Sequence, residues 1–206
     1  MTTRAAGWAW LLAGVAYVLC ETVAAQQYPD YSYARDYISA LGVPSASPSA
    51  ALMNAGAFVL HGILFATAGV TLARTTGVSR RRRTVITGLA LANGIGNVLV
   101  GLFHAGASPL HGFGALLAIV GGNAAMIVAG GMLGTLGVPR WFCIVSRVAG
   151  AIGVAAFVTL LAVAGADTGV EGAVERGAVY PIIAWDVAVG LLLVTRARRS
   201  PHSVWG

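Results

Sequence analysis

The 206-residue sequence has few charged side chains and no lysine at all. Aspartate, glutamate and arginine together make up only 10% of the residues, whereas 57% are hydrophobic. A soluble domain carries roughly a quarter charged residues, so this chain has too little polar surface to cover a water-soluble globule. The composition therefore predicts a protein whose solvent is lipid.

Other absences exclude several classes of function. The two cysteines, Cys20 and Cys143, form no CxxC or Cys/His spacing of the kind that binds zinc in small domains. No phosphate-binding glycine loop follows a strand, and no GxSxG nucleophile motif is present. The net charge is +6, but the arginines stand at the edges of apolar runs, as membrane topology requires, so nucleic acid is not an expected partner.

Apolar runs long enough to cross a membrane recur six times. A backbone in hydrocarbon must satisfy its hydrogen bonds within its own segment, so each run is predicted to be a helix, and the alternation typical of a transmembrane barrel strand is missing. The predicted fold class is all-α, a polytopic membrane protein with six transmembrane helices in a single domain, residues 1–206. The predicted spans are 6–25, 51–74, 84–104, 110–133, 147–166 and 177–196.

The arginines also predict an orientation. Only Arg35 and Arg176 fall on one side of the predicted membrane, and all the others fall on the opposite side. By the positive-inside rule, both termini are cytoplasmic and residues 26–50 form the largest extracytoplasmic loop. We therefore expect a multi-pass protein of a bacterial plasma membrane.

Polar side chains inside the predicted spans are costly and mark candidate functional positions. Glu21, His104 and His111 lie near the extracytoplasmic ends of their spans, close to one another at one level. The others lie deeper, and His61 and Asp186 each lie roughly 14 Å in, counting 1.5 Å per residue. Asn93, Asn97 and His104 share one helical face. We expect these residues to line an outward-facing pocket: Glu21, His61, Asn93, Asn97, His104, His111 and Asp186.

Three interpretations of these side chains remain open. Imidazole and carboxylate groups are zinc ligands, so a zinc site could be built from Glu21, His61, His104 and His111. Alternatively, His61 and Asp186 could form a buried pair that relays protons or simply stabilises the fold. In the third, the histidines near the turn are interfacial and the asparagines are hydrogen-bonding contacts between helices.

The tyrosine-rich loop could cover this pocket. Its lid candidates are Tyr31, Arg35, Asp36 and Ser39. A short interfacial helix is predicted over 34–41, capped by Asp36 and ended by Gly42 and Pro44. The alternative is an amphipathic loop that lies on the membrane with its tyrosines at headgroup depth.

Three segments carry a family resemblance: "YISALG", "PSAALMNAG" and "GLFHAGASPLHGFGALLAIVGG". Together they resemble the bacterial integral-membrane family called domain of unknown function 998, which is similar to the Frag/DRAM-like proteins. The resemblance implies six helices, an "ISxLG" segment after the first, and a histidine at position 111. His104 and Ala105 stand where the family more often has proline and an acidic residue.

The leading functional expectation is the binding of a lipid or small amphiphile in the outward-facing pocket, with membrane lipids as partners. One alternative is a metal-dependent intramembrane lipid hydrolase, by remote analogy with the ceramidase-like enzymes, which use zinc. Others are a proton-coupled transporter and a structural subunit of a larger assembly.

Overall fold

A computed structural model describes residues 2–75 and 77–196, and within them six helices are long and apolar enough to cross a membrane. The prediction of an all-helical, multi-pass membrane protein is thus confirmed. The second span is one continuous helix, Ala50–Thr75, made of a short α-helical part, a π-helical part and a longer α-helical part. The elements are α1 (Thr3–Gln27), α2 (Ala50–Leu52), the π-helical η2 (Met53–Leu60), α3 (His61–Thr75), α4 (Arg80–Leu102), α5 (Pro109–Gly130), α6 (Arg140–Val163) and α7 (Glu171–Arg196).

Three of the helices begin at least four residues earlier than the sequence predicted. α4, α6 and α7 begin at Arg80, Arg140 and Glu171 rather than at 84, 147 and 177. Charged residues had been assigned to loops, but a helix can continue beyond the hydrocarbon while its long charged side chains reach the interface. The start of α4 is also capped, because the Ser79 hydroxyl accepts the Arg82 backbone N–H at 3.4 Å.

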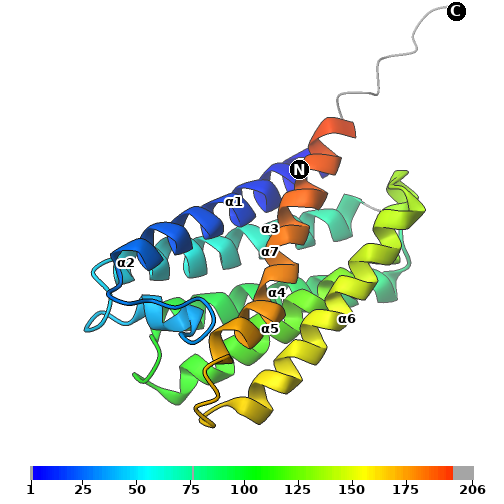
Figure 1. The fold of residues 1–206 in the computed structure, drawn as a ribbon. Coiled ribbons are helices and arrows are strands. Elements are labelled where there is room, and N and C mark those ends of the chain that lie inside the picture. The colour runs from blue at the N-terminus through cyan, green and yellow to red at the C-terminus, as the bar shows by residue number, and fades with distance from the viewer. Residues whose placement is uncertain (1, 76, 197–206) are drawn as a thin grey trace, which may run out of the picture.

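The six spans form a ring in which each packs on its neighbours in the sequence. α1 packs on α3, α3 on α4, α4 on α5, α5 on α6 and α6 on α7, and α7 closes the ring against α1. Figure 1 shows α7 crossing the front of the molecule obliquely, between α1 and α6. Many large apolar side chains on the outer faces are exposed, including Trp141 and Ile152 of α6. These faces suit contact with lipid.

Glycines bring α4 and α5 into backbone contact. A Cβ atom added to Gly96 would lie 2.5 Å from the Gly114 carbonyl oxygen, closer than real Cβ atoms approach. Small residues permit such close helix packing in membranes. The close packing places Asn93 of α4 within hydrogen-bonding distance of the Ala118 carbonyl of α5.

The bundle has two unlike ends (Figure 1). The loop end carries residues 28–49, 103–108 and 164–170. The arginine end carries every described arginine except Arg35 and Arg176. At the arginine end, α5 is followed by the short 3-10 segment η3 (Leu133–Leu136).

In the long loop, the helix predicted over 34–41 is replaced by the 3-10 segment η1 (Ile38–Gly42). The prediction was wrong because Asp36 does not cap a helix. Its backbone N–H donates to the Ser32 carbonyl, and its carboxylate accepts the Ser32 N–H, both at 2.8 Å, which closes a turn before η1.

Candidate functional site

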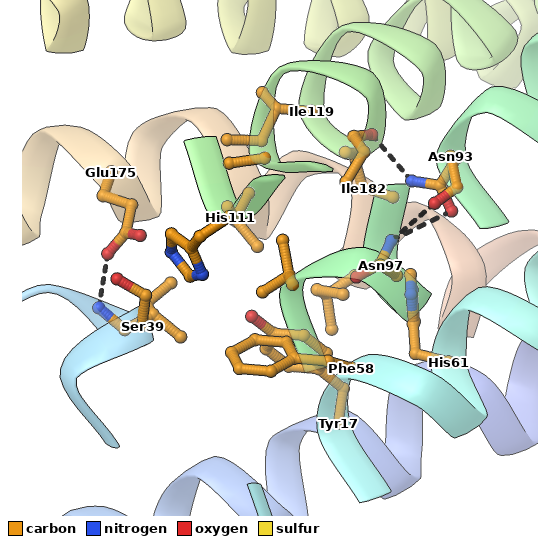
Figure 2. A pocket seen from close by; sticks show the side chains of 16 residues that line it. Tyr17, Ser39, Phe58, His61, Asn93, Asn97, His111, Ile119, Glu175 and Ile182 are labelled. Atoms are coloured by element: carbon orange, nitrogen blue, oxygen red, sulfur yellow. Dashed lines mark hydrogen bonds between the residues drawn. The ribbon is translucent and has the colours of Figure 1, made fainter. Parts of the chain in front are cut away.

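A cavity of about 50 Å³ lies inside the ring near the loop end. Helices α1, α4, α5 and α7 and the second span all contribute to its wall, and η1 covers it with Ile38 and Ser39. Figure 2 shows the polar side chains that face this space. The residues lining it are Tyr17, Ile38, Ser39, Phe58, His61, Asn93, Asn97, Val100, His111, Ala115, Ala118, Ile119, Glu175, Val179, Ile182 and Ile183.

Two asparagines of α4 form one wall. The Asn93 amide nitrogen donates to the Ala118 carbonyl of α5 at 2.7 Å. The Asn97 amide nitrogen donates to the Asn93 backbone carbonyl at 3.0 Å and to the Asn93 side-chain oxygen at 3.3 Å. Asn93 thus links two helices, as one of the sequence interpretations held. Within the described residues no donor reaches the side-chain oxygen of Asn97, which leaves an acceptor at the cavity.

His111, near the start of α5, lies at the outer side of the cavity. Its Nδ1 is 2.8 Å from the Phe103 carbonyl oxygen. A carbonyl only accepts, so Nδ1 carries the proton and, in the neutral ring, Nε2 carries a lone pair. The bond also ties the end of α4 to the start of α5.

Glu175 of α7 faces His111 across the same end of the cavity (Figure 2). One of its carboxyl oxygens accepts the backbone N–H of Ile38, which holds η1 over the opening. Asn54 anchors the other end of η1, because its amide donates to the Gly42 carbonyl at 2.8 Å. The cover of the cavity is therefore attached to α7 at one end and to η2 at the other.

His61 forms the floor together with Asp186, which lies behind the cavity wall. His61 Nε2 is 2.9 Å from an Asp186 carboxyl oxygen, and the side chains are 2% and 0% exposed. The Tyr17 ring and the imidazole pack edge to face, with centroids 5.5 Å apart. The pair considered from the sequence is thus formed. His61 Nδ1 and the second Asp186 oxygen are buried without a hydrogen-bond partner in the described structure.

Glu21 belongs to a different cluster. Its carboxylate pairs with the Arg176 guanidinium at 3.0 Å and accepts the Tyr180 hydroxyl at 2.9 Å. Glu21 is therefore not among the residues that line the cavity, and instead borders a groove between α1 and α7.

Arg176 also holds the long loop in place. Its Nη1 donates to the Tyr33 and Asp36 carbonyls at 2.8 and 3.0 Å, and its Nη2 donates to the Tyr31 hydroxyl at 2.5 Å. The guanidinium lies over the Tyr33 ring, 4.6 Å from its centroid, which adds a cation–π contact. One buried cation thus joins α7, α1 and the loop.

The four lid candidates occupy different places. Tyr31 lies against Arg176 and donates to the Tyr37 carbonyl at 3.0 Å, and burial raises the pKa of its hydroxyl. Arg35 is exposed and donates to the Asp36 carboxyl at 2.8 Å. These hydrogen bonds hold the pKa of Asp36 below its usual range. Of the four, only Ser39 reaches the cavity.

The four candidate zinc ligands do not come together. Glu21 is engaged by Arg176, His61 by Asp186, and the His104 ring nitrogen Nδ1 lies 2.9 Å from the Ala105 carbonyl in the turn after α4. In the part of the chain that the structure describes, no three His, Cys, Asp or Glu side chains are grouped as metal ligands would be. The donor set therefore does not fit a zinc centre.

Sequence reasoning missed Tyr17, Glu175 and Arg176 as parts of these sites. The last two stand in "VERGAVY", just before position 177, where the sixth span was predicted to begin. An earlier start at Glu171 would have marked them as ionisable groups within a span. Tyr17 lies four residues before Glu21, on the same face of α1, and that spacing was an available signal.

A family model matches most of the chain. Residues 11–192 match the family described as "Protein of unknown function (DUF998)". No curated protein and no solved structure was found to match the chain. Because the match covers most of the sequence, including every element that lines the cavity, the chain belongs to the DUF998 family of multi-pass membrane proteins.

Proposed function

We propose that the protein binds the polar end of a small amphiphile in the cavity beneath η1. The observation that carries this proposal is the set of hydrogen-bond acceptors left facing one enclosed space. These are the side-chain oxygen of Asn97, Nε2 of His111 in its neutral form, and the Glu175 carboxyl group, whose oxygens have lone pairs beyond those that accept the backbone N–H groups of Ile38 and Ser39. The rest of the lining is mostly apolar, as in small-molecule sites, where a few polar groups set the orientation.

The acceptors favour a ligand that donates hydrogen bonds. A hydroxyl or amine group satisfies an amide oxygen, an imidazole lone pair and a carboxylate, whereas an anionic group would meet the Glu175 carboxylate. A cavity of about 50 Å³ holds a few water molecules or a headgroup of a few atoms. A larger ligand requires η1 to move, which breaks the hydrogen bonds of Ile38 and Ser39 to Glu175 and of the Gly42 carbonyl to Asn54.

Filling the cavity is expected to remove the ligand. Ala115→Leu places a larger side chain in the cavity wall, and Ala151→Leu adds the same group on the exposed face of α6. Molecules extracted from wild-type protein purified in mild detergent are identified by mass spectrometry. We expect one amphiphile to be enriched in wild type and in Ala151→Leu, and reduced about tenfold in Ala115→Leu.

A control for this experiment is an unrelated multi-pass protein purified in the same detergent. An amphiphile found equally in that protein, or retained in full by folded Ala115→Leu protein, would reject the cavity as its site. Equal melting temperatures of the two variants establish that the loss does not reflect unfolding.

We also infer that the protein lies in a bacterial plasma membrane with the arginine end in the cytoplasm. The support is the positive-inside rule, since Arg35 and Arg176 are the only described arginines at the loop end. A membrane-impermeant maleimide is expected to label Ala107→Cys, at the loop end, in intact cells. Thr135→Cys, in η3, is expected to react only after permeabilisation. The reverse pattern would show the opposite orientation.

A further inference from the structure

We propose that the arginine end holds a second site, which binds the phosphate of an anionic membrane lipid. The site is a groove of about 540 Å³ between α4, α5 and α6, far along the bundle from the cavity. The proposal is independent of the amphiphile site. The groove is lined by Ser79, Arg81, Arg82, Val85, Ile127, Val128, Gly131 and Arg147.

Three guanidinium groups from two helices meet at this groove. Arg81 and Arg82 come from the first turn of α4, and Arg147 comes from α6. Among the described residues, ion pairs form at Arg35, His61 and Arg176, so no carboxylate balances the three cations. Guanidinium groups bind phosphate through paired hydrogen bonds, and the start of α4 adds the positive end of its helix dipole. The charge of the groove is complementary to a phosphate.

Gly131 allows Arg147 to lie over the end of α5. A Cβ atom at Gly131 would lie 3.0 Å from Nη2 of Arg147, so a side chain there would crowd the guanidinium. Arg147 lies seven residues into α6, roughly 10 Å from the helix start by the rise of an α-helix. Arg147, which lies within the span, therefore lines the same groove as Arg81 and Arg82 at the start of α4.

The apolar part of the groove indicates a lipid rather than a free anion. Val85 is 42% exposed, and Ile127 and Val128 are half-buried beside it. A soluble phosphate gains nothing from such a surface, whereas the acyl chains of a lipid bury it. The volume of the groove also lies within the range of about 300–1,000 Å³ that is usual for ligand sites.

Matched charge removal tests this site. The groove variant is Arg81→Gln/Arg82→Gln/Arg147→Gln. The control is Arg80→Gln/Arg83→Gln/Arg140→Gln, which removes three arginines of the same end that do not line the groove. Dioleoyl phosphatidylglycerol is titrated into delipidated protein in detergent, and bound lipid is counted by native mass spectrometry. We expect wild type and control to bind alike and the groove variant to bind about tenfold more weakly.

Two further probes distinguish the source of the phosphate. Dioleoyl phosphatidylcholine is expected to bind weakly, because its choline carries a positive charge toward the arginines. Inorganic phosphate at millimolar concentration is expected not to displace phosphatidylglycerol. Equal weakening in both triple variants, equal binding of the two lipids, or displacement by inorganic phosphate would each overturn the proposal. If the groove triple does not fold, Arg147→Gln compared with Arg140→Gln makes the same test.

Discussion

Replacing Arg176 with alanine is expected to lower the free energy of unfolding by about 3–5 kcal/mol, the cost typical of removing one partner from a buried ion pair. Arg176 is 6% exposed and its partner Glu21 is 3% exposed. The variant leaves the Glu21 carboxylate buried without its cation, and it removes the Arg176 donor from the Tyr33 and Asp36 carbonyls. Reversible unfolding in mixed micelles, followed by circular dichroism, measures the change.

Arg35→Ala is the matched control for Arg176→Ala. Arg35 lies in the loop that Arg176 holds, but its guanidinium is exposed and, among the described residues, pairs only with its neighbour Asp36 and the Asp30 carbonyl. Exposed ion pairs contribute little to stability, so Arg35→Ala is expected to unfold like wild type. If Arg176→Ala also unfolds like wild type, the cluster around Arg176 does not hold the loop.

Replacing Asp186 with alanine is expected to cost about 3 kcal/mol, the upper part of the range for a buried polar group that loses its partner. Asp186 is fully buried, and the only hydrogen bond to its side chain among the described residues comes from His61. Alanine leaves the His61 imidazole in an apolar and aromatic environment with neither ring nitrogen bonded. The same unfolding measurement applies, with the exposed Asp167→Asn expected to behave like wild type, because asparagine tolerates the positive φ of 53° at this position.

The Asp186→Asn variant distinguishes a structural role of the His61–Asp186 pair from a role in proton transfer. An amide oxygen can still accept the His61 Nε2–H, so most of the stability is expected to remain. An amide cannot change its charge, however, so any proton flux through the pair would be lost. Proteoliposomes with an internal pH-sensitive dye measure that flux. If proton flux persists in Asp186→Asn, the His61–Asp186 pair has a structural role only. If Asp186→Ala is as stable as wild type, the pair has no structural role either.

The histidines show how far spacing could predict this protein. His61 and Asp186 were predicted at the same depth by counting residues from the span ends, and they are in contact. Counting residues gives the depth of a side chain along its helix, but not how the helix is rotated about its own axis. His104 and His111 were predicted close together at one level, yet only His111 lines the cavity. The difference arises because α4 ends at Leu102, which places His104 in the turn rather than on the polar helical face.

Glu21 and Arg176 show what spacing could not predict. Glu21 was expected to face the histidines, and Arg176 was counted only as a topology signal outside the sixth span. Their contact depends on α7 returning to pack on α1, across 155 positions of sequence. No local sequence pattern predicts the packing of α7 on α1, because it follows from the combined packing of all six spans.

The sequence by itself determined that this is a six-span helical membrane protein with its arginines concentrated at one end. The physical reason is that hydrocarbon accepts only long apolar helices and excludes charge, so composition and run length are sufficient. Only the tertiary structure decided which polar groups share a space. Ring closure by α7 places Glu175 and His111 at one cavity and pairs Glu21 with Arg176 in a separate cluster, and the packing of α6 on α5 places Arg147 at the groove beside the start of α4. Each of these depends on helix rotation and close glycine contacts, which only packing in three dimensions sets.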